Sequence, residues 1–132
     1  MRGRHFIQVA LLFCVALATA AGAQEGHPLK GSWIGDWSSS PTQRTPLTLV
    51  MDWDGKTINA IVNPGTDNLP VTVTLNPADW SVHLEGSAKD RAGNTVRLVA
   101  DGKIQSIGLP NRLLAGSWTQ GDVKGDFRVR RQ

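Results

Sequence analysis

One stretch of the sequence decides the fold class: Gly31-Ser32-Trp33-Ile34-Gly35-Asp36-Trp37, echoed further along the chain by Gly116-Ser117-Trp118. In a β-strand alternate residues share a face, so glycine and tryptophan alternate along one side of the first stretch. Glycine lets the backbone bend or a neighbouring strand approach, and each indole fills the space beside it. The pattern therefore predicts a strand in a tightly curved sheet.

Outward from this stretch, the chain repeats short runs in which apolar and polar residues alternate, separated by turns rich in Gly, Pro, Asp and Asn. This period and composition are typical of strands. Asp54-Gly55 is a two-residue hairpin signal, because both positions tolerate a positive φ. An apolar piece from Ile104 to Ile107 is predicted to be either an extra strand or a segment crossing the end of the sheet. The predicted strands are 32–37, 46–53, 56–62, 69–76, 80–88, 94–100, 111–119 and 123–130.

Outside the first residues, no segment shows the 3.6-residue period of a helix, so the chain is all-β. A meander of strands leaves two unpaired edges unless its first and last strands meet. The Gly-x-Trp pattern near both ends favours closure. We therefore predict one antiparallel, eight-stranded, up-and-down β-barrel over residues 31–132. Such a barrel either fills its interior with side chains or holds one small ligand, and its many large apolar side chains favour filling.

The N-terminus has the three parts of a secretory signal peptide. Arg2 and Arg4 precede an apolar run, and Ala21-Gly22-Ala23 is typical of a cleavage site. We predict a helical signal peptide over residues 1–23, a flexible lead-in over 24–30, and export to the periplasm or beyond. A retained anchor or lipid attachment at Cys14 are the alternatives, but the apolar run is short for a membrane span, and Phe13 is not the small residue that lipidation needs.

Composition narrows the function classes. The chain has 14 Lys and Arg and 11 Asp and Glu, and removal of residues 1–23 leaves these charges nearly balanced and interleaved. Nucleic-acid binding therefore has little support, and the mature chain is not expected to be embedded in a membrane. The only cysteine, Cys14, lies in the predicted signal peptide, so the mature chain has neither a disulfide nor a thiolate metal site.

Gly31-x-Trp33 on the first strand, a meander of about eight strands and an arginine on the last strand resemble the calycin barrels, which include lipocalins, avidins and fatty-acid-binding proteins. The resemblance implies that Trp33 lies at one end of the barrel with Arg128 or Arg130 across its ring, a cation–π contact. Trp33, Trp118 and Arg128 would then close the barrel. The chain lacks the C-terminal helix and the disulfide of lipocalins. In size it also resembles small periplasmic barrels that inhibit proteases.

Five tryptophans and no tyrosine form the strongest functional signal in the sequence. Indoles stack on sugars or line apolar pockets, although tryptophans on the inner face also serve simply as core. Trp80 is expected at a rim because it follows Pro77 and lies between Asp79 and Ser81. The candidate ligand-binding residues are Trp53, Trp80 and Trp37.

Few residues are candidates for chemistry. His83 and Glu85 share a strand face and form a possible acid–base pair, but any exposed strand places charges in this way. Asp36, Asp52 and Asp54 suggest a calcium site, although a turn already explains Asp54. Phosphate-binding and acyl-transfer motifs are missing, so no catalytic residue, metal or cofactor is predicted.

Three functional hypotheses remain. The first is an exported, non-catalytic barrel that binds a small apolar or sugar-like ligand at one open end. The second is a periplasmic interaction module, such as a protease inhibitor, that engages a protein through residues 24–30 or its rim loops. The third is an enzyme that uses the face of His83 and Glu85.

Overall fold

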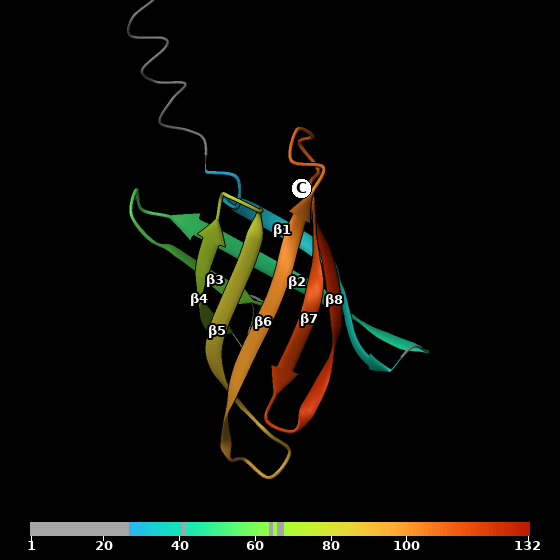
Figure 1. Ribbon diagram of the computed structural model, residues 1–132. Coiled ribbons are helices and arrows are strands. Elements are labelled where there is room, and N and C mark those ends of the chain that lie inside the picture. Colours follow the sequence, from blue (N-terminus) through green and yellow to red (C-terminus); the bar gives the residue numbers. More distant parts are fainter. Residues whose placement is uncertain (1–26, 41, 64, 66–67) are drawn as a thin grey trace, which may run out of the picture.

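The structure is a computed structural model that describes residues 27–40, 42–63, 65 and 68–132, so the predicted signal peptide lies outside the described residues. Each strand pairs antiparallel with the next along the chain, and the last pairs with the first, so the barrel is closed (Figure 1). The prediction of a closed, eight-stranded, up-and-down barrel is confirmed. The strands are β1 (Gly31–Ser40), β2 (Gln43–Trp53), β3 (Ile58–Val62), β4 (Leu69–Asn76), β5 (Ser81–Lys89), β6 (Thr95–Gln105), β7 (Leu113–Gln120) and β8 (Val123–Arg131).

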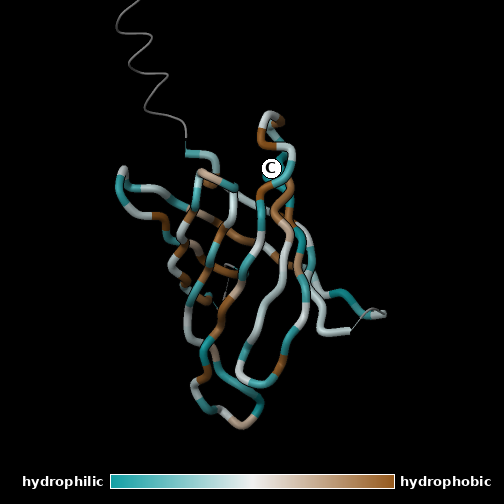
Figure 2. The backbone as a smooth tube through the Cα atoms, viewed as in Figure 1, coloured by the Kyte–Doolittle hydropathy of each residue, from teal (hydrophilic) through white to brown (hydrophobic). Residues whose placement is uncertain are grey.

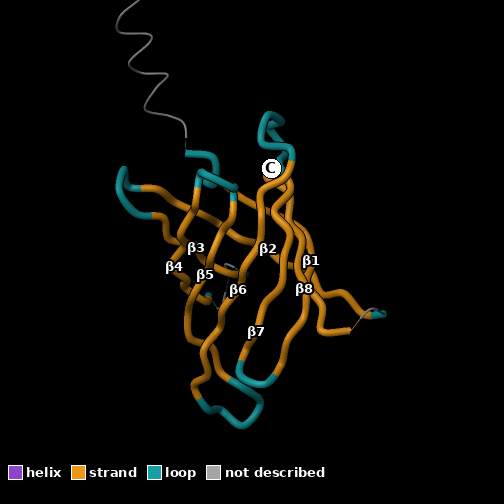
Figure 3. Tube along the Cα trace, viewed as in Figure 1, coloured by secondary structure: helices purple, strands orange, loops and turns teal. Residues whose placement is uncertain are grey.

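Strands account for all the regular secondary structure in the described part of the chain (Figure 3). Accordingly, these residues include no helix of the length and apolarity needed to cross a membrane. The Gly-x-Trp strand lies at the closure: Trp33 is opposite Arg131 of β8 and Leu49 of β2. Both edges of β1 are therefore paired, as the meander argument requires.

Alternation along the strands separates the core from the outer wall. Figure 2 shows hydrophobic and hydrophilic positions alternating along much of the trace. On β5, for example, Val82 and Leu84 point inward and are buried, whereas His83 and Glu85 lie on the outer face. The largest fully buried side chains gather toward one end of the barrel and are Trp33, Leu29, Met51, Leu114, Val82 and Val129.

β6 is longer than the sequence analysis predicted. The predicted strand 94–100 ends just before Asp101-Gly102, but both residues lie inside β6, which continues to Gln105 and buries Ile104. Gly102 pairs with Gly116 of β7, and a Cβ on Gly102 would lie 3.1 Å from the Phe127 ring and 2.7 Å from the Ala115 carbonyl oxygen. The glycine is needed for this close approach rather than for a turn.

The two ends of the barrel differ. Residues 27–30, the β6–β7 loop and the C-terminus lie at one end, which we call the packed end (Figure 1). The β5–β6 and β7–β8 turns lie at the other, which we call the open end. At the packed end Leu29 is fully buried and its carbonyl accepts a hydrogen bond of 2.8 Å from Trp33 Nε1. Residues 27–30 therefore pack against the barrel, whereas residues 24–26 of the predicted flexible lead-in 24–30 lie outside the described residues.

Candidate binding cavity

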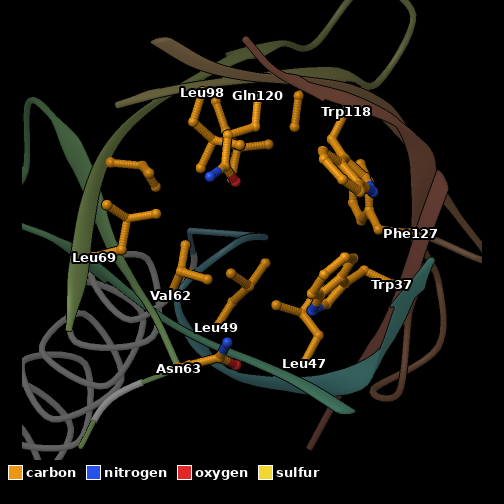
Figure 4. A pocket seen from close by; sticks show the side chains of 13 residues that line it. Trp37, Leu47, Leu49, Val62, Asn63, Leu69, Leu98, Trp118, Gln120 and Phe127 are labelled. Carbon is orange, nitrogen blue, oxygen red and sulfur yellow. The ribbon is translucent and has the colours of Figure 1, made fainter. Parts of the chain in front are cut away.

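The open end contains a cavity of about 180 Å³. All eight strands contribute side chains to it, and none of the 13 lining residues is charged (Figure 4). The sequence favoured an interior filled with side chains. Large apolar side chains are indeed buried toward the packed end, but the open end retains a space. The lining residues are Trp37, Leu47, Leu49, Val62, Asn63, Leu69, Val71, Leu84, Leu98, Ala100, Trp118, Gln120 and Phe127.

Two tryptophans form one wall of the cavity. Trp37 of β1 and Trp118 of β7 meet edge to face, with ring centroids 5.1 Å apart and an interplanar angle of 87°. This is a favourable arrangement for the two ring quadrupoles. Trp118 Nε1 donates a 3.0 Å hydrogen bond to the Asp126 carbonyl, which fixes that indole against the wall. The two rings together present an aromatic surface to the cavity.

Two amide side chains are the only polar lining residues apart from the indoles. Asn63 follows β3, and its Oδ1 accepts a 3.0 Å hydrogen bond from the Thr48 backbone N–H. Gln120 ends β7, and its Nε2 donates a 3.2 Å hydrogen bond to the Lys89 carbonyl. Figure 4 shows the two amides on different sides of the lumen. Each amide is held by a backbone group of a neighbouring segment.

The structure divides the predicted ligand-binding tryptophans between the two ends. Trp37 lines the cavity, whereas Trp53 and Trp80 lie at the packed end and do not line it. The Trp53 ring lies 5.3 Å from the imidazole of His27, and burial lowers the pKa of that histidine. Trp80 has a φ of 59°, and its carbonyl accepts a 2.9 Å hydrogen bond from Ile104 N–H. Both tryptophans pack against the core, and Trp80 also lines a second pocket together with His27 and Leu75.

The three residues predicted to close the barrel lie in different parts of the structure. Trp33 is fully buried at the packed end, and Trp118 belongs to the cavity wall. Arg128 lies at the β1–β8 closure but on the outer face, where its Nε is 3.3 Å from Asp36 Oδ1 and its side chain is 62% exposed. The expectation that Arg128 or Arg130 covers the Trp33 ring is therefore wrong. The arginine that shares the inner face with Trp33 is Arg131, whose Nε donates to the Lys30 carbonyl at 2.8 Å.

The outer wall carries the charged groups considered for catalysis. His83 Nδ1 lies 2.6 Å from Asp101 and Nε2 lies 2.8 Å from Glu85. Donation of hydrogen bonds to the carboxylates of Asp101 and, to a smaller extent, Glu85 raises the pKa of His83. Hydrogen bonds accepted from His83 and Arg97 lower the pKa of Glu85. Both ring nitrogens of His83 are therefore engaged by carboxylates on the outer wall, away from the cavity.

The predicted calcium set does not come together. Asp36 accepts a hydrogen bond from the Arg44 guanidinium, and this contact lowers the pKa of the Asp36 carboxyl. Asp54 accepts hydrogen bonds from the backbone N–H groups of Lys56 and Thr57. Asp52 lies on the outer face of β2, opposite Asn59. Among the residues that the structure describes, no cluster of three His, Cys, Asp or Glu side chains has the geometry to hold a metal ion.

The two polar lining residues, Asn63 and Gln120, were not predicted from the sequence. Gln120 continues the inward-facing positions Leu114, Gly116 and Trp118. The alternation therefore indicates an inward side chain at residue 120, but the predicted strand ended at residue 119. Asn63 lies just beyond the predicted strand 56–62. Its backbone has a positive φ of 48°, so it does not continue the alternation of β3, and its side chain lines the cavity.

Together these features define a class of protein: a small closed up-and-down β-barrel with an apolar cavity at its open end, an arrangement compatible with the calycin barrels. No protein-family model matches the chain, and neither does any curated protein or solved structure.

Proposed function

We propose that this barrel binds one small, largely apolar molecule in the cavity at its open end, and that it is a calycin-type binding protein without catalytic activity. The observation that carries the proposal is the uncharged cavity of about 180 Å³, walled by Trp37 and Trp118. Pockets for small molecules are typically concave and apolar, with a few placed polar groups. Asn63 and Gln120 are such groups here.

The volume limits the size of the ligand. A buried apolar space of about 150 Å³ accommodates a benzene ring, whereas drug-sized ligands occupy sites of about 300 Å³ or more. The cavity therefore suits a molecule of one or two rings, with some of it emerging at the mouth. At about 0.5 kcal/mol per non-hydrogen atom, a ten-carbon ligand would bind with a free energy of about −5 kcal/mol, a Kd of roughly 200 μM.

The lining favours an apolar ligand over a sugar. A sugar carries a hydroxyl group on nearly every carbon, and each hydroxyl buried without a partner costs free energy. Two amide side chains are too few to satisfy them. Of the two ligand classes expected from the sequence, apolar and sugar-like molecules, we therefore propose the apolar class.

The packing of residues 27–30 argues against their use as a docking segment for a protein partner. Leu29 is buried, and the carbonyl oxygens on either side of it accept hydrogen bonds from arginines: Pro28 from Arg112 Nη1 at 3.0 Å, and Lys30 from Arg131 Nε. A partner that bound this segment would first have to detach it from the barrel.

NMR of the indole N–H groups tests the proposal directly, because the five tryptophans report on both ends of the barrel. Titration with naphthalene is expected to shift the Trp37 and Trp118 signals and to leave those of Trp53 and Trp80 in place. Methyl glucoside, added at the same concentrations, should produce no saturable shift.

A cavity-filling variant provides the control. Ala100 lines the cavity, so Ala100→Leu should weaken naphthalene binding by at least tenfold. Val99→Leu, one residue away on the outer face of β6, should bind as the unmodified protein does. Indole signals that do not move with naphthalene, or a shift confined to Trp53 and Trp80, would refute the proposal.

A further inference from the structure

We infer that the cavity mouth selects neutral ligands with a hydrogen-bond acceptor at one edge and a donor at the other, through Asn63 and Gln120 respectively. The inference rests on the proposed function and deepens it by naming the ligand class. It follows from the backbone groups that hold the two amides.

Asn63 presents a donor. The Thr48 backbone N–H can only donate, so the atom it meets, at 3.0 Å, must be the amide oxygen of Asn63. A second hydrogen bond, from Asn63 N–H to the Thr48 carbonyl at 2.6 Å, fixes the residue in place. Among the described residues no group accepts from Nδ2. In Figure 4 this nitrogen lies on the lumen side of the rim. Asn63 therefore offers an N–H to a ligand acceptor such as a carbonyl oxygen.

Gln120 presents an acceptor for the complementary reason. The Lys89 carbonyl can only accept, so the atom that meets it, at 3.2 Å, must be the amide nitrogen of Gln120. Its Oε1 has no donor within the described ranges, and Figure 4 shows the amide reaching into the lumen. Gln120 therefore offers an oxygen to a ligand O–H or N–H.

The charge of the ligand follows from the same surroundings. No lining side chain carries a charge that could compensate a carboxylate or an ammonium group. A carboxylate at the Gln120 side would also meet an amide oxygen, which repels it. Neutral molecules with an apolar body are therefore preferred over fatty acids and other carboxylates.

Matched ligands test this inference. The series consists of naphthalene, naphthalene with a hydroxyl group at one end, naphthalene with an acetyl group at one end, naphthalene with both groups at opposite ends, and the naphthalene carboxylate. Because one well-formed hydrogen bond contributes a modest net free energy, each added group should tighten binding by roughly three- to tenfold. The doubly substituted compound should bind tightest and the carboxylate weakest.

Two near-isosteric variants assign each group to its residue. Asn63→Asp keeps an oxygen for Thr48 N–H but replaces the donor, so it should abolish the gain from the acetyl group alone. Gln120→Met removes the acceptor and should abolish the gain from the hydroxyl group alone. Asn63→Gly, which tolerates the φ of 48° at this position, repeats the first test without adding charge.

The outcomes separate the two proposals. If naphthalene binds the unmodified protein and both variants equally but neither substituent improves affinity, or the gains survive both substitutions, the donor–acceptor inference is wrong and the binding function stands. If naphthalene itself fails to bind the unmodified protein, the binding function is wrong.

Discussion

Substitution of Trp33 by alanine should be the most damaging single change at the packed end. The indole is fully buried and donates to the Leu29 carbonyl. A buried indole removes about 150–250 Å² from water, worth roughly 4–6 kcal/mol by area as an upper bound. Measured large-to-small substitutions of this kind cost about 3–5 kcal/mol, since the surrounding structure collapses only partly. We expect Trp33→Ala to lower the free energy of unfolding by that amount.

Urea denaturation followed by far-ultraviolet circular dichroism measures this loss. Trp33→Phe should cost less, because it keeps most of the volume and removes the hydrogen bond to Leu29. Ile34→Ala is the control: its side chain is next along β1, points outward and is 50% exposed, so its loss should stay near or below about 0.5 kcal/mol. A cost below about 1 kcal/mol for Trp33→Ala would refute our account of the packed end.

Two further predictions concern the wall. The folded-state pKa of His83 is raised, so its charged pairs stabilise the barrel fully below the unfolded-state pKa, and this contribution disappears as pH rises through the folded-state pKa. From pH 6 to pH 8 the melting temperature of the unmodified protein should therefore fall relative to that of His83→Gln, by at most a few degrees, because such exposed pairs contribute at most about 1 kcal/mol. Comparison of the two proteins cancels the opposite effect of His27, whose pKa is lowered by burial. An equal slope in both proteins would contradict this prediction. Gly116→Ala should lower the free energy of unfolding in urea by about 3 kcal/mol or more, because its Cβ would lie 1.9 Å from the Asp101 carbonyl oxygen. Gly108→Ala, whose Cβ would have no atom within 4 Å, is the control and should be neutral. Similar stabilities for the two variants would show that β6 and β7 do not approach as closely as described.

The strands could be predicted from the sequence because one face of the barrel wall contacts solvent and the other contacts the core. Polar and apolar residues therefore alternate along each strand. The Gly-x-Trp pattern also predicted the closure between β1 and β8. The end of β6 was predicted too early, at residue 100. The reason is that a glycine required by the close approach of two strands, such as Gly102, has the same local sequence pattern as a glycine in a turn. Only knowledge of the neighbouring strand distinguishes the two.

The candidate site was harder to predict because alternation gives the face of a residue but not its height in the barrel. Trp33 and Trp37 share a face and are four residues apart along β1, yet one is buried at the packed end and the other lines the cavity. Height depends on strand tilt and register, which a single sequence does not display. The burial of Leu29 was missed for a related reason: its partner is the Trp33 indole, and no periodic pattern marks it.

The pairing of β1 with β8 has a kinetic consequence. Asp36 lies opposite Arg128, so the contacts that complete the barrel join segments at opposite ends of the domain. Such non-local pairing requires a large loss of chain entropy before any hydrogen bond forms, and this places the barrel among slowly folding topologies. Until β8 arrives, the free edge of β1 is open to pairing with another chain. The nascent protein should accordingly be most prone to aggregation in the interval before closure, when a chaperone that masks strand edges would have its greatest effect.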